Sequence, residues 1–197
     1  MTARRMRAVL LGATALLAGL VLLAWSQPWF TLTLSSSSGD PTPLEVRGDV
    51  AAGALAPLAL AVLAVVAALA LSGRVFRIIF GVLEALLGVC VVAATLVTLG
   101  DPATASASAI TEVTGIAGSD SVAALVAEVA TSAWPFVAIV IGALTVVVGG
   151  TVVATARRWP VSGRKYTRTR TAASDASDSV AEWDALSEGD DPTSTSR

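Results

Sequence analysis

Side chains that could do chemistry are scarce in this chain, and Glu84 stands out because it lies inside a long apolar stretch. Such carboxylates are rare in membrane segments and usually functional, since burying the charge is costly. Arg77 lies seven residues earlier, about 10 Å along a helix axis. Glu84 therefore has two open roles: a functional group within the membrane, or a structural group that pairs with Arg77 or Arg74 or is neutral through desolvation.

The amino-acid inventory excludes most familiar kinds of catalysis. The 197 residues include no histidine and one cysteine, Cys90. Ser-His-Asp and Cys-His mechanisms are therefore excluded, and Cys90 is expected to be an inert small hydrophobe. The sequence also shows no glycine-rich phosphate loop, no metal-ligand spacing and no paired catalytic carboxylates. We expect a protein that is not an enzyme and that holds no cofactor or metal.

The elements that would position Glu84 follow from composition and hydropathy. Hydrophobic residues make up 54% of the chain and charged residues 14%, below the about 25% of soluble domains. Four apolar runs have close to or more than the ~20 residues that cross a bilayer; they are residues 8–25, 50–71, 78–99 and 135–156. We predict an all-α integral membrane domain, residues 1–160, with four transmembrane helices in a bundle. A cleaved signal peptide is the alternative for the first run.

Aromatic residues and proline mark where the runs end. The first run ends in the segment Trp25-Ser26-Gln27-Pro28-Trp29, and Trp134 precedes the last run. Tryptophan prefers the membrane–water interface, and proline cannot donate the next helical hydrogen bond. We therefore predict that Trp25, Trp29 and Trp134 lie at the outer interface and Trp159 at the inner one.

The two outer segments carry different periodicities. Residues 31–34 and 44–47 alternate polar and apolar around a turn-forming cluster, which predicts either a short outer β-hairpin or an irregular polar loop. Before the last run, apolar residues recur with helical spacing at Val122, Leu125, Val126 and Val129. That pattern predicts an amphipathic helix that lies on the membrane or on the bundle.

Charge segregation predicts the orientation. Arginine and lysine cluster before the first run, between the second and third, and after the fourth, whereas the other two connections are mainly acidic. By the positive-inside rule both termini are cytoplasmic, and we expect a multi-pass plasma-membrane protein. Residues 161–197 are basic and then acidic, and we expect a disordered tail whose basic part contacts anionic lipids and not nucleic acid.

Small residues recur every three or four positions in three of the runs, on one helix face each. They are Ala8, Gly12, Ala15 and Gly19; Gly81, Ala85 and Gly88; and Ala138, Gly142, Thr145 and Gly149. Small faces let membrane helices approach closely, so they predict tight packing within the bundle, with a homo-oligomer seam as the alternative. Arg77, Glu84 and Thr95 share the face of the second set, which should point into the bundle.

The sequence resembles a known family at its Trp25-Ser26-Gln27-Pro28-Trp29 segment, at Gly48 before Ala56-Pro57-Leu58, at Trp134-Pro135 and at Arg157-Arg158-Trp159-Pro160. The resemblance, over residues 4–165, is to the tryptophan-biosynthesis-associated membrane proteins of high-GC bacteria, four-helix proteins whose genes lie beside tryptophan-synthesis genes. It implies a context in tryptophan metabolism and no active site. The architecture is also similar to that of claudins, without their paired outer cysteines.

Two functions are consistent with these observations. The first is a non-enzymatic membrane protein in tryptophan handling, either an accessory or a small transporter component. The second is a structural envelope protein that binds a partner through its outer segments. The polar material for a transport path is thin (Glu84, Thr95, Thr98 and Thr145), so transport would require a homo-oligomer or another membrane protein.

Overall fold

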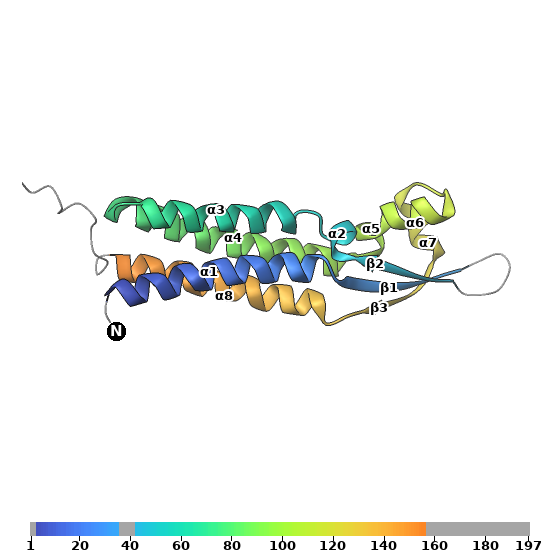
Figure 1. The fold of residues 1–197 in the computed structure, drawn as a ribbon. Coiled ribbons are helices and arrows are strands. Elements are labelled where there is room, and N and C mark those ends of the chain that lie inside the picture. The colour runs from blue at the N-terminus through green and yellow to red at the C-terminus, as the bar shows by residue number, and fades with distance from the viewer. Residues whose placement is uncertain (1–2, 36–41, 157–197) are drawn as a thin grey trace, which may run out of the picture. The chain divides into compact units, whose positions relative to one another are not determined.

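The computed structural model describes residues 3–35 and 42–156. The predicted tail, with Trp159, lies outside the described residues. The elements in chain order (Figure 1) are α1 Ala3–Trp25, β1 Pro28–Leu34, β2 Thr42–Arg47, α2 Gly48–Ala51, α3 Leu55–Leu71, α4 Arg74–Gly100, α5 Pro102–Ala105, α6 Ala107–Thr114, α7 Ser119–Leu125, β3 Val126–Thr131 and α8 Trp134–Thr155.

The four long helices α1, α3, α4 and α8 lie side by side (Figure 1). Helix α1 packs against α3 and α8, and α4 packs against the same two helices, so α1 and α4 face each other across the centre. Within the described residues three helices, α1, α4 and α8, are long and apolar enough to cross a membrane. Helix α3 is equally apolar but has 17 residues, a length of about 25 Å.

The second apolar run is not one continuous helix, which corrects the predicted span of residues 50–71. Its start forms the short helix α2, and α3 begins only at Leu55. Gly53 lies in the turn between them, and Pro57 has no N–H to donate to the carbonyl of Gly53, so a helical hydrogen bond is missing at this point. Helix α4 begins at Arg74, four residues before the predicted start of the third run at residue 78.

Small residues bring α4 and α8 into close contact, as their spacing predicts. A Cβ atom added to Gly88 would lie 2.7 Å from the carbonyl oxygen of Gly142, and one added to Gly149 would lie 2.6 Å from the nitrogen of Ala85. The small face of α1 does not pack in this way. Gly12 and Gly19 are exposed and have open space around them, so the prediction of packing within the bundle is wrong for that helix, and the homo-oligomer seam stays a prediction.

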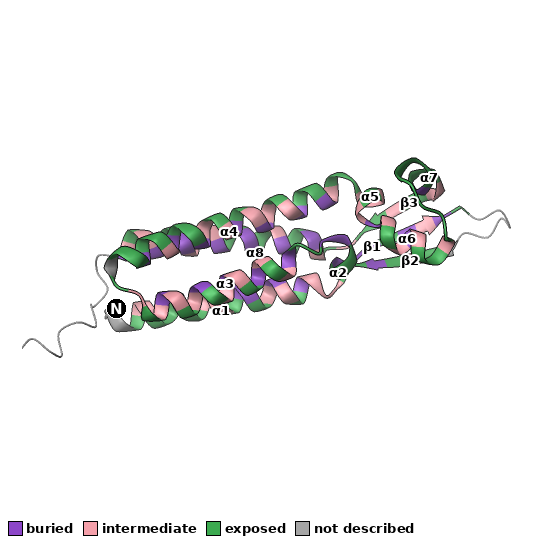
Figure 2. Cartoon of the chain, turned by 90° about the horizontal axis from the view of Figure 1, so that it is seen from above, coloured by how far each residue is buried: buried purple, intermediate pink, exposed green. Residues whose placement is uncertain are grey.

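The core-facing side of α1 is instead formed by larger residues. Its buried side chains are Leu10, Thr14, Leu17, Ala18, Val21 and Ala24. These residues fill the space toward α3 and α8, whereas the glycines lie on the outer side. In Figure 2 the buried residues line the inner sides of the long helices.

A three-stranded antiparallel sheet, in the order β2-β1-β3, follows the long helices. Strands β1 and β2 pair as the predicted outer hairpin, with Leu32 opposite Leu44 and Thr31 opposite Glu45. The hairpin alternative is therefore confirmed. Alternation places Leu32 in the core, where it is 0% exposed, and leaves Thr31 exposed.

The predicted amphipathic helix before α8 is only half correct. Residues 119–125 form α7, but Val126 and Val129 lie in strand β3, which pairs with β1. Strand β1 has a second edge whose backbone groups need partners, and valine and threonine favour strands. A tertiary hydrogen-bond partner therefore overrides the local helical pattern.

Candidate functional site

The carboxyl group of Glu84 lies at the centre of the long helices. Its side chain is fully buried, and its Oε1 is 2.8 Å from Oγ1 of Thr14, which is also fully buried. Because α1 and α4 are not direct neighbours, this hydrogen bond crosses the middle of the packed helices. Oε2 of Glu84 has no hydrogen-bond partner among the described residues, and the predicted pairing with Arg77 or Arg74 stays a prediction.

A regular line of buried residues on α4 positions Glu84. The line consists of Arg77, Gly81, Glu84, Gly88, Val91, Thr95 and Thr98. Steps of four and three keep these residues on one face of a helix. The prediction that the face of Arg77 and Glu84 points into the bundle is therefore confirmed, and Arg77 itself is 1% exposed.

Sequence reasoning did not single out Thr14 as a functional residue. The signal for it was present, because Thr14 is the sole hydroxyl-bearing residue in the apolar run of residues 8–24. The partnership with Glu84 was not predictable, because the two residues are 70 positions apart. Only the arrangement of α1 and α4 brings them together.

The other buried threonines of the long helices bond to their own backbones. Oγ1 of Thr95 donates to the carbonyl of Val91 at 2.9 Å, Thr98 to Ala94 at 3.0 Å, and Thr145 to Ile141 at 2.9 Å. Such back-bonds to the carbonyl one turn earlier are common for threonine in helices. These hydroxyls have therefore used their one hydrogen, and they can only accept a hydrogen bond from a passing solute.

The segment from Trp25 to Trp29 joins the helices to the sheet. Trp29 is 0% exposed, and its Nε1 donates to the carbonyl of Ala24 at 2.8 Å. Pro28, the first residue of β1, accepts a hydrogen bond from Oγ of Ser132 at 2.7 Å. The backbone carbonyl of Gln27 accepts from the N–H of Gly48 at 2.9 Å. The segment thus ties together the starts of β1, α2 and α8.

The ring of Trp29 belongs to the core of this junction and is 0% exposed, so the protein itself shields it from headgroups. Its depth in the membrane stays a prediction. The ring is buried because the sheet and Gly48 cover it at the point where the chain leaves α1. Trp25 and Trp134 are half-buried, so they keep an exposed side, and their interfacial position stays a prediction.

An apolar groove of about 280 Å³ lies between α3 and α4. It is lined by residues that include Ala61, Val65, Ala68, Phe80, Leu83 and Leu87. No polar side chain lines it, so it has no group to bind the ammonium and carboxylate of a free amino acid. The groove is a poor candidate for a tryptophan site.

Comparison with protein families shows to which family this chain belongs. The family model of the tryptophan-associated transmembrane proteins matches residues 10–193. The chain belongs to this family. The match confirms the resemblance drawn from the tryptophan-rich segment, and it extends through the tail, beyond residue 165 where the predicted resemblance ended. Comparison with curated proteins and with solved structures gives no match.

Proposed function

We propose that this chain is a non-enzymatic membrane protein that serves tryptophan handling, as an accessory or as a small transporter component. Its membership of the tryptophan-associated transmembrane family carries the link to tryptophan. The buried Glu84–Thr14 contact supports a function within the membrane, because a carboxyl group at this position is costly to maintain. The absence of histidine supports a role without catalysis.

The polar centre of one chain is small for a transport path. Besides the buried Arg77, it consists of Glu84, Thr14 and threonines whose hydroxyls donate to their own helices. Among the described residues of a single copy, these are few groups to replace the hydration of an amino acid in passage. The proposal accordingly includes a homo-oligomer or a second membrane protein that completes the path.

The proposed topology has four spans, with α3 and α2 together making the second. Both termini are then cytoplasmic in the plasma membrane, the sheet lies outside, and the basic stretch after α8 contacts anionic lipids. Cysteine labelling in a Cys90→Ala background tests this with probes at positions 37, 119 and 187. Labelling from outside is expected at Ser37→Cys and Ser119→Cys. Outside labelling at Ser187→Cys contradicts the topology.

Uptake and efflux of labelled tryptophan in a deletion strain test the function. We expect altered flux that is restored by the wild-type chain and by Glu128→Gln, which replaces an exposed carboxylate of β3. Glu84→Gln at wild-type membrane abundance should fail to restore the flux. Unchanged flux in the deletion strain contradicts the proposal.

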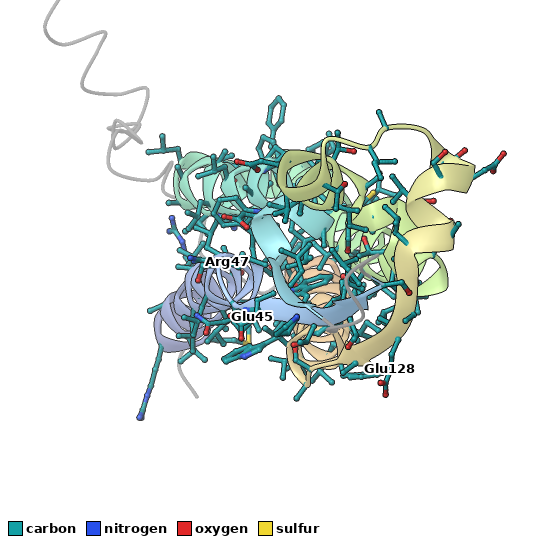
Figure 3. All side chains as sticks on the ribbon, turned by 90° about the vertical axis from the view of Figure 1, so that its right-hand side faces the viewer. Glu45, Arg47 and Glu128 are labelled. Carbon is teal, nitrogen blue, oxygen red and sulfur yellow. The ribbon has the colours of Figure 1, made fainter. Side chains whose placement is uncertain are left out.

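A structural role in the cell envelope is the second candidate, favoured by the sheet. Its exposed face carries the charged residues Glu45 and Arg47 on β2 and Glu128 on β3 (Figure 3). Exposed charges beside hydrogen-bonding strand edges suit a protein partner. An altered envelope with normal tryptophan flux, reversed by the wild-type chain and not by a Glu45→Lys, Glu128→Lys variant, would favour this role.

A further inference from the structure

The hydrogen bonds around Thr14 determine where a proton must lie. Oγ1 of Thr14 is 2.9 Å from the carbonyl oxygen of Leu10 and 2.8 Å from Oε1 of Glu84. Both distances are those of full hydrogen bonds. A threonine hydroxyl has one hydrogen to donate and can accept others. If Glu84 were ionised, both neighbours would be acceptors and one contact would lack a hydrogen.

Other threonines show how the Thr14 hydroxyl hydrogen is used. Thr95, Thr98 and Thr145 each donate to the carbonyl four residues earlier, as Thr14 does toward Leu10. Thr98 also has a second acceptor, the carbonyl of Ala51, but at 3.3 Å this is a longer contact. The contact between Thr14 and Glu84 is the shorter of the two around Thr14, and a second hydrogen, carried by Glu84, accounts for it.

From these contacts we infer that Glu84 is a membrane-embedded proton-binding site: its Oε1–H donates to Thr14, whose hydroxyl donates to Leu10. The ligand of the site is a single proton, held by a neutral carboxyl group at neutral pH. The inference goes beyond the proposed function and does not depend on tryptophan transport. When the proton leaves, Thr14 must turn its hydrogen from Leu10 to the carboxylate.

The surroundings of Glu84 agree with a neutral group. Its second oxygen, Oε2, is buried and has no hydrogen-bond partner among the described residues. One unpaired oxygen is far less costly on a neutral acid than on a carboxylate. The close approach of Gly149 to Ala85 beside it seals α4 against α8, which excludes water from that side.

The charged groups around the site are distant. Helices α3 and α8 contain no ionisable residue, and α1 contributes only arginines near its start, of which Arg7 is seven residues from Thr14. On α4 itself Arg77 and Arg74 lie seven and ten residues before Glu84, about 10 and 15 Å along the axis. Cys90, the other titratable group of α4, lies outside the buried line. Within α4, therefore, no cation lies within one helical turn of Glu84.

Infrared spectroscopy of the full chain in lipid nanodiscs tests the proton directly. We expect a carbonyl band of a protonated carboxyl group at pH 7, lost in Glu84→Gln and unchanged in Glu128→Gln. Thr14→Val should shift this band to higher frequency by removing the acceptor, and Thr14→Ser should restore its position. A wild-type chain without the band at pH 7 overturns the inference, and so does a band that Thr14→Val leaves unmoved.

Chemical labelling of the wild-type chain keeps the test independent of the folding of any variant. A membrane-soluble carbodiimide reacts with protonated carboxyl groups in apolar surroundings. Mass spectrometry should find the label on Glu84 at pH 7, with yield falling several-fold as the pH is raised. Label confined to the exposed carboxylates, such as Glu45 and Glu128, overturns the inference.

Discussion

The indole of Trp29 lies directly against the backbone of Gly48. A Cβ atom on Gly48 would be 2.6 Å from Trp29 Nε1 and 2.6 Å from the carbonyl oxygen of Trp25. Trp29 is itself held by its hydrogen bond to Ala24, so the ring cannot move aside freely. This contact fixes the segment that follows α1 against the start of α2.

Gly48→Ala should therefore destabilise the junction, by about 1–3 kcal/mol as for other overpacked sites. Unfolding in mixed detergent micelles, followed by tryptophan fluorescence, measures the change. Gly53→Ala is the matched control, because its Cβ would meet nothing closer than the carbonyl of Asp49 at 3.6 Å. Equal stability of the two variants would show that the contact is relaxed in solution.

Adjacent glycines of α8 provide a second comparison. Gly149→Ala places a Cβ 2.6 Å from backbone of α4, whereas Gly150→Ala points into open space. We expect Gly149→Ala to separate α4 from α8 at a cost of about 1–3 kcal/mol and Gly150→Ala to be neutral or slightly stabilising. A disulfide cross-linking assay between α4 and α8, read beside an unfolding titration, measures both effects. Loss of stability in Gly150→Ala alone would refute the assigned packing face.

Trp25, the last residue of α1, and Trp29 in β1 should respond differently to loss of their N–H groups. Trp29→Phe removes a buried hydrogen bond to Ala24 and should cost about 1 kcal/mol beyond lost packing. Nε1 of Trp25 is buried without a partner among the described residues, so Trp25→Phe should cost less. Unfolding titrations of both variants decide the order, and a larger loss for Trp25→Phe would contradict the structure.

Asp101, just outside the span of α4, should make stability depend on acid pH. Hydrogen bonds from the side chain and backbone N–H of Thr104 hold the pKa of Asp101 below its ordinary value. The stabilisation is therefore present at neutral pH and is lost as the pH falls through the lowered folded-state pKa. Asp101→Asn should flatten the acid limb of a stability–pH curve. An unchanged limb in Asp101→Asn would contradict the capping role.

The sequence alone determined that this is a membrane protein, which family it belongs to and which face of α4 points inward. These depend on composition and on spacing along one helix, which are local properties. The face of Arg77, Gly81 and Glu84 follows from the period of a helix whatever the rest of the chain does. The alternation in β1 and β2 likewise indicated the hairpin, although it left an irregular loop open.

Only the tertiary structure decided the features that join distant residues. Val126 and Val129 lie in a strand because β1 offers them a free edge, and Trp29 is buried because Gly48 packs against its ring. The packing of Gly81 and Gly88, in contrast to the exposure of Gly12 and Gly19, depended on which helix lay opposite. The meeting of Thr14 with Glu84 needed two helices placed across a common centre. Periodicity specifies which residues share a face, but the partner of that face is set by long-range packing.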